Sequence, residues 1–169
     1  SNLVDPEKAI AILEELYKTD SLNIDVDYKL GRIYYEKIKD YEKAVFHFEK
    51  STKFLETEED IAALGPSRYY SLGLASEKIK DYEKALFSWL KSSELDVDNS
   101  FANSYYLYSN IGNLYENIFQ NYIKALEYYN KEVEVDPDSY EGLQRRAELL
   151  DKKMMLPNEA LSAYNLLVR

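Results

Sequence analysis

The side chains that most often do chemistry are sparse in this chain of 169 residues. It has one histidine, His47, and no cysteine, so it offers neither a usual zinc ligand set nor a thiolate nucleophile. Its 31 acidic residues lie mostly at helix starts and on predicted solvent faces, where capping and solvation account for them. Glycine-rich phosphate loops and nucleophile elbows are absent from the sequence. We therefore expect no catalytic, metal or cofactor site, a structural role for His47, and a protein that is not an enzyme.

Charge and hydropathy narrow the classes of partner. The net charge is −10 and the pI is about 4.7, which argues against nucleic acid and anionic membrane surfaces because both require basic patches. No apolar run approaches the ~18 residues of a membrane span, so direct membrane insertion is not expected. We expect a soluble protein whose partner is neutral or basic. The sequence leaves the compartment open, and cytoplasmic is the working expectation.

The elements behind this composition are repeated. The string EKIKDYEKA occurs at residues 36–44 and again at 77–85, and related signatures place alanines at positions 9, 44, 85, 125 and 160. Apolar residues follow each alanine with helical spacing. The Asp or Asn at the start of each signature is a good N-cap, so the signature predicts the start of a helix. Thr57 is expected to cap a further helical turn, and the following Gly65-Pro66 to break or kink the chain.

A second helix is predicted upstream of each signature, with a glycine at Gly31, Gly73 or Gly112. Glycine inside a helix costs about 1 kcal/mol relative to alanine, so its recurrence implies that another helix approaches closely. We expect the alanine of the following helix to be the contact, with aromatic residues at the flanks. The predicted unit is an antiparallel pair of helices, an αα-hairpin.

These motifs resemble the tetratricopeptide repeat family. The best copy consists of Tyr69, Leu72, Gly73, Ser76, Ala85, Trp89 and Ser92. The Sel-type relative also has longer repeats, but its glycine-rich loop is absent here. The resemblance covers nearly the whole chain and implies an all-α fold, in which αα-hairpin repeats stack into a right-handed superhelix.

The repeat spacing predicts one domain over residues 1–169. Residues 1–20 match only the second helix of a repeat, which leads us to expect a piece of a longer protein. Complete repeats are expected at 24–56, 57–98 and 99–137, and a degenerate one at 138–169.

The resemblance also implies where a partner would bind, because the first helices of such repeats line a concave groove. The corresponding positions in this chain are Tyr28, Arg32, Tyr35, Tyr70, Leu74, Tyr106, Asn110, Asn113 and Arg145. Aromatic faces, amides and arginines suit an extended peptide or a partner helix, so the expected function is a non-catalytic scaffold for protein–protein interaction. The same residues are also compatible with a solvated face that binds nothing. Two alternatives stay open: a structural module that self-associates through its terminal helices, and a regulatory segment of a larger enzyme or sensor.

Overall fold

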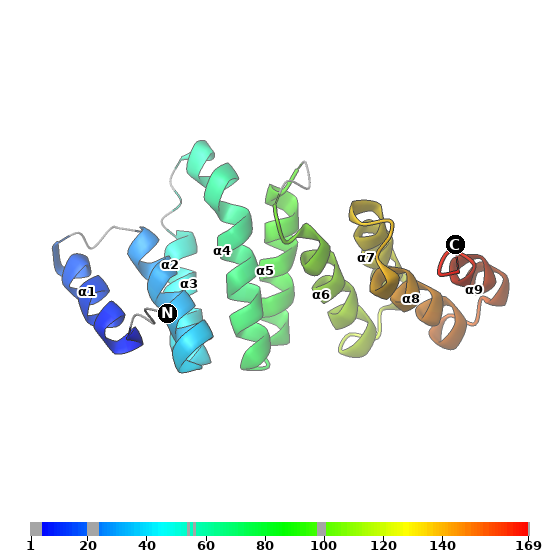
Figure 1. Ribbon diagram of the computed structural model, residues 1–169, viewed down its shortest axis with the longest axis horizontal. Coiled ribbons are helices and arrows are strands. Elements are labelled where there is room, and N and C mark those ends of the chain that lie inside the picture. Colours follow the sequence, from blue (N-terminus) through cyan, green and yellow to red (C-terminus); the bar gives the residue numbers. More distant parts are fainter. Residues whose placement is uncertain (1–4, 20–23, 54, 56, 98–100, 169) are drawn as a thin grey trace. The chain divides into compact units, whose positions relative to one another are not determined.

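The computed structural model describes residues 5–19, 24–53, 55, 57–97 and 101–168, and every regular element in these ranges is helical. The chain is divided into two compact units, residues 1–95 and 96–169. The first unit contains α1 (Pro6–Thr19), α2 (Ile24–Ile33), a π-helical turn η1 (Tyr34–Ile38), α3 (Tyr41–Lys53), α4 (Glu58–Lys78) and α5 (Tyr82–Leu95) (Figure 1). The second contains α6 (Ser104–Asn117), α7 (Tyr122–Val135), α8 (Tyr140–Glu148), a π-helical turn η2 (Leu149–Lys153) and α9 (Pro157–Tyr164). The chain is thus an all-α repeat protein, as predicted.

The turns inside the hairpins explain the repeated string. Asp40, Asp81 and Asn121 each accept a hydrogen bond of 3.1 Å from the backbone N–H three residues later, so the predicted N-caps are confirmed. The residue just before each cap has a positive φ, namely 65° at Lys39, 63° at Lys80 and 51° at Gln120. A left-handed residue ends the first helix and the cap then starts the second, so the two helices can run antiparallel.

The glycines of the first helices have a different neighbour from the expected one. A Cβ atom added to the glycine would lie 2.6 Å from the Phe48 ring at Gly31, 2.3 Å from the Trp89 ring at Gly73 and 2.4 Å from the Tyr129 ring at Gly112. The expectation that alanine is the nearest contact of each glycine was therefore wrong. A helix that lacks a side chain at this point leaves room for a large ring from its partner helix, and all three rings are buried.

A break or a kink was predicted at Gly65-Pro66, and the break does not occur. Helix α4 runs without interruption over 21 residues from its cap at Thr57, whose hydroxyl accepts a 3.0 Å hydrogen bond from the Asp60 N–H. Both Gly65 and Pro66 are buried, and the Ser92 hydroxyl of α5 donates a 2.7 Å hydrogen bond to the Pro66 carbonyl. Packing against α5 thus stabilises a helix that the proline alone would weaken by about 3 kcal/mol.

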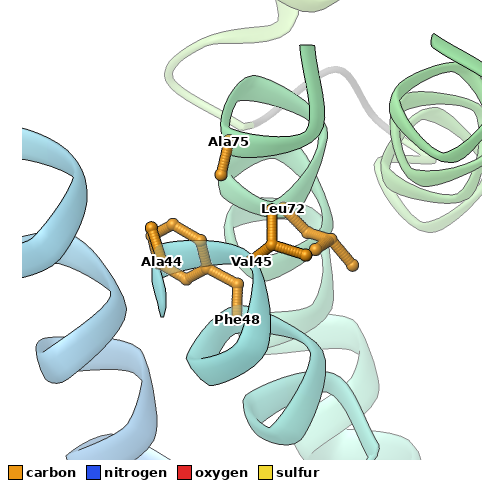
Figure 2. Close-up of a cluster of buried hydrophobic side chains, with 5 residues drawn as sticks. All are labelled: Ala44, Val45, Phe48, Leu72 and Ala75. Carbon is orange, nitrogen blue, oxygen red and sulfur yellow. The ribbon is translucent and has the colours of Figure 1, made fainter. Parts of the chain in front are cut away.

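Consecutive hairpins of the first unit share a core. Figure 2 shows Ala44, Val45 and Phe48 of α3 against Leu72 and Ala75 of α4. The second helix of one hairpin therefore packs on the first helix of the next, which is how repeats of this kind stack. Helix α1 joins the same unit through Tyr17, whose hydroxyl accepts a hydrogen bond from Lys50 of α3.

The second unit repeats this arrangement. Ala125 and Tyr129 of α7 form a buried cluster with Leu149, which follows α8. Ala160 and Ala163 of α9 pack in turn on Ala147 of α8. Within the described parts of both units, no helix combines the length and apolarity that crossing a membrane would need.

Candidate functional site

The single histidine lies inside the first hairpin. His47 Nδ1 is 2.8 Å from Oδ1 of Asp27, which is almost fully buried, and the imidazole stacks on the Tyr34 ring at 5.5 Å. Lys50 Nζ lies 3.6 Å from the other oxygen of the same carboxylate. The pair joins α2 to α3, which is the structural role expected for His47. Among the described residues, no group of three or more His, Asp or Glu side chains is placed to hold a metal ion.

Tyr28 connects the first helices of two consecutive hairpins. Its hydroxyl lies 3.2 Å from the Ser71 hydroxyl on α4, and its ring packs on Phe48 at 5.7 Å. The Arg68 guanidinium covers the ring at 4.8 Å and is paired with Asp25 at 2.6 Å. Arg68 is buried, and the sequence analysis did not identify it. Tyr28 is thus half-buried, and part of its surface is used to hold α2 against α4.

The other predicted residues of the first unit differ in exposure. Arg32 is exposed and forms a 2.7 Å ion pair with Glu36 one turn later. Tyr35 is half-buried against Tyr41, with ring centroids 5.5 Å apart, and burial raises the pKa of its phenol. Tyr70 and Leu74 of α4 are half-buried as well. Of the five, Arg32 therefore offers the most accessible polar group.

In the second unit, three predicted residues form a stripe on α6. Tyr106, Asn110 and Asn113 are spaced i, i+4 and i+7, which places them on one face of the helix. The Tyr106 side chain is 58% exposed, although its ring packs edge-on against Tyr105. Asn113 is held in place because its Oδ1 accepts a 2.9 Å hydrogen bond from the Tyr129 hydroxyl. The stripe presents one accessible ring above two amides.

Arg145, the fourth predicted residue of this unit, is part of a buried polar network. Its guanidinium pairs with Glu132 of α7, which is 0% exposed, and donates a 3.2 Å hydrogen bond to the Tyr105 hydroxyl. That hydroxyl lies 2.6 Å from the Ser139 hydroxyl at the start of α8. Burial, the largest single influence, would lower the pKa of Arg145, but the hydrogen bonds and charges of Glu132 and Tyr105 together outweigh it and the pKa is raised. Arg145 thus connects three helices, in addition to any role in binding.

A signal for this network is present in the sequence. Glu132 occupies the repeat position that Ser51 and Ser92 fill in the preceding hairpins, and both serines are fully buried. A carboxylate at such a position needs a cationic partner, because an unpaired buried charge is very costly. Gly142 faces it, since a Cβ atom added there would lie 3.3 Å from the Glu132 carboxyl carbon.

The nine predicted residues are divided between the two units. Tyr28, Arg32, Tyr35, Tyr70 and Leu74 belong to the first unit, whereas Tyr106, Asn110, Asn113 and Arg145 belong to the second. That all nine line one groove stays a prediction.

Comparison with known proteins supports the assignment of the fold. Residues 28–54 match the family model described as tetratricopeptide repeat. A crystal structure of MamA is 22% identical, with a TM-score of 0.79 over 97% of this chain and 87% of that one. The structure of MamA from Desulfovibrio magneticus RS-1 is 23% identical, with a TM-score of 0.71 over 96% and 84% of the two chains.

A further similar structure is that of YrrB, described as a TPR protein with an unusual peptide-binding site. It is 20% identical, with a TM-score of 0.73 over 96% of this chain and 76% of that one. A search of the curated proteins gave no match. The repeated hairpins and these likenesses show an all-α helical repeat protein that shares its fold with MamA and YrrB, and residues 28–54 match one tetratricopeptide repeat.

Proposed function

We propose that this protein is a non-catalytic scaffold that binds a peptide segment or partner helix on the exposed faces of its first helices. The observation that carries the proposal is the stripe of Tyr106, Asn110 and Asn113 on α6. A half-exposed tyrosine ring supplies apolar contact area with little conformational entropy to lose, and amides can pair with the N–H and C=O groups of an extended chain.

Preorganisation supports the same proposal. Asn113 is fixed by Tyr129, and the ring of Tyr106 rests on Tyr105, which is itself bonded to Ser139. Side chains that are already ordered lose little entropy when a ligand binds. The net charge of −10 favours a neutral or basic peptide. The fold is shared with YrrB, whose description includes a peptide-binding site, and this likeness is a further reason to test peptides first.

The test starts from a display library of random peptides of about 12 residues, selected on the full chain. The affinity of the enriched peptides is then measured by fluorescence anisotropy for the wild type and for Tyr106→Ala. We expect a loss of about tenfold or more, as for an aromatic contact of ordinary strength. Arg145 is unsuitable for this purpose, because its removal would strand the buried Glu132.

Ile123→Ala is the matched control. Ile123 is also a large exposed side chain of the second unit, at 75% exposed, but it belongs to α7, a second helix, and so lies outside the proposed site. Its substitution should leave the affinity unchanged. The proposal fails if no peptide is enriched, or if the two variants bind the enriched peptides equally well while circular dichroism shows that both are folded.

A further inference from the structure

A groove with a volume of about 530 Å³ lies among α7, α8 and α9 of the second unit. Part of its wall is apolar, because Leu150 and Ala163 are buried in one cluster and Leu126 packs against them. The other side chains that line the groove are Asn130, Arg146, Glu159, Ser162 and Leu166. The groove therefore combines an apolar surface with one cationic group.

Arg146 differs from the other arginines described so far. Arg32, Arg68 and Arg145 are each paired with a carboxylate. Arg146 is half-buried and forms no ion pair with any of the residues that the structure describes. Burial lowers the pKa of its guanidinium, whereas the bond to Glu36 raises the pKa of Arg32. A cation that is partly removed from water without a partner is stabilised when an anion binds beside it.

The equivalent position in the first unit is closed by packing. The buried leucines Leu72 and Leu143 hold matching places in α4 and α8. Three residues after Leu72 comes Ala75, which is 0% exposed and belongs to the core shared with α3. Three residues after Leu143 comes Arg146, which lines the groove. The repeat thus places a charged side chain where the other hairpin has a small apolar one.

The helices on either side of this position also differ between the units. In the first unit, α3 and α5 are joined by a 2.8 Å ion pair between Glu49 and Lys84. Counting from the aligned alanines of the repeats, the same two positions in α7 and α9 are Asn130 and Glu159. An amide and a carboxylate form no ion pair, so the groove lacks this connection. All the positions compared belong to complete hairpins.

These features define the chemistry of a ligand. A guanidinium binds a carboxylate through two parallel N–H bonds, and the Asn130 amide can donate a further one. The leucines suit an apolar body, and the volume is that of an ordinary small-molecule site. Glu159, the acidic residue of the lining, disfavours a second negative charge on the ligand. We propose that the groove among α7, α8 and α9 binds a small organic molecule with a single carboxylate at one end and an apolar body at the other.

This site is separate from the proposed peptide-binding faces. None of the side chains that line the groove belongs to the nine residues predicted for those faces. Variants in the groove therefore test it without disturbing the other site. Failure of either proposal leaves the other intact.

The probe is phenylbutyrate, which has one carboxylate and an aromatic body. Phenylbutyramide has the same body without the charge, and inorganic phosphate is an anion without an apolar body. Binding of each compound to the full chain is followed by the shifts of backbone amide signals in NMR titrations. We expect phenylbutyrate to bind the wild type at least about tenfold more tightly than either of the other two compounds.

Arg146→Gln should weaken the binding of phenylbutyrate by about tenfold or more, because the guanidinium is lost. Lys124→Gln is the matched control, since it removes the same charge from an exposed side chain of the second unit that does not line the groove. It should leave the affinity for phenylbutyrate unchanged.

Ser162→Phe is a second test, and it leaves the net charge unaltered. Ser162 is exposed and holds the position that Phe87 has in α5, so an aromatic ring is compatible with the fold at this place. Because Ser162 lines the groove, the added ring should occupy part of its volume and weaken the binding of phenylbutyrate.

The proposal is overturned if phenylbutyrate causes no amide shifts, or if phenylbutyramide or phosphate binds as tightly as phenylbutyrate. It is also overturned if Arg146→Gln and Lys124→Gln bind phenylbutyrate equally well while circular dichroism shows that both are folded. Unchanged binding by a folded Ser162→Phe variant would place the ligand outside the groove and would have the same consequence.

Discussion

The contact between Gly73 and Trp89 leads to a prediction with a defined sign. Replacing Gly73 by alanine should raise the helix propensity of α4 by about 1 kcal/mol. The new Cβ atom, however, would lie 2.3 Å from Nε1 and 2.4 Å from Cδ1 of an indole that is 0% exposed. Such a distance is far below van der Waals contact, so the ring or the backbone has to move.

The cost follows from what the ring holds. Overpacking a core by one methyl group costs about 1–3 kcal/mol. Moving the indole also strains the 3.2 Å hydrogen bond from its Nε1 to the Tyr70 carbonyl, whose loss would cost about 0.5–1.5 kcal/mol. After the gain in propensity is subtracted, Gly73→Ala should destabilise the protein by about 1–3 kcal/mol. The midpoint of thermal unfolding should then fall by roughly 4–8 °C at the middle of that range.

A double-mutant cycle tests the cause as well as the size. In a Trp89→Leu background the smaller side chain leaves room for a methyl group, so Gly73→Ala should there be neutral or stabilising by up to about 1 kcal/mol. Unfolding is followed by circular dichroism, because Trp89 is the only tryptophan and its fluorescence is lost in half of the cycle. If Gly73→Ala destabilises both backgrounds equally, the glycine does not serve to accommodate the ring.

Three further predictions concern buried charge, turns and pH. Arg145→Ala should destabilise the protein by about 2–4 kcal/mol in thermal unfolding, because it leaves the buried Glu132 carboxylate without its partner. Adding Glu132→Gln should recover part of this loss, because a neutral amide replaces the unpaired charge. If the double variant is no more stable than Arg145→Ala, the prediction is contradicted. Lys80→Gly should stabilise the protein by about 0.5–1 kcal/mol, because φ at this residue is 63°. Its control Lys91→Gly, inside α5, should destabilise the protein by about 1 kcal/mol, and urea titrations that give both changes the same sign would refute this. Burial and a hydrogen bond to Glu116 raise the pKa of Tyr129, so the folded state holds this proton more tightly than the unfolded state and the free energy of unfolding should fall as the pH rises above about 10. Urea titrations at pH 8 and pH 10.5 should show a smaller fall in the free energy of unfolding for Tyr129→Phe than for the wild type. An equal fall in the two proteins would contradict the prediction.

The sequence predicted the local parts of this fold well, because they depend on neighbouring residues. The caps at Asp40 and Asp81 were found from a short motif, and their hydrogen bonds span only three residues. The hairpins followed from helical spacing and from the recurrence of that motif. Of the break or kink expected at Pro66, the break does not occur, because local propensity is outweighed by packing against α5, and a short stretch of sequence does not contain that contact.

The candidate site was harder to predict for the same reason. Transfer of the family's positions selected Tyr106 and Asn110, which share one face of α6, and Tyr106 is accessible there. The same transfer of positions selected Tyr28 and Arg145, whose side chains also contact Ser71 and Glu132 across helix interfaces. Which neighbour a side chain meets depends on how each helix is rotated about its axis, and residue spacing within a single helix does not fix that rotation.

By itself, the sequence determined the repeat unit, the hairpin and the start of each second helix, because identical short strings impose identical local geometry. Only the tertiary structure decided that a ring fills the space beside each repeated glycine. It alone showed that Arg68 and Glu132 are buried with their partners, and that Arg146 lines a groove among α7, α8 and α9. The physical reason is that these features join residues from different helices, and their energies depend on shape and charge complementarity that exists only once the helices have packed.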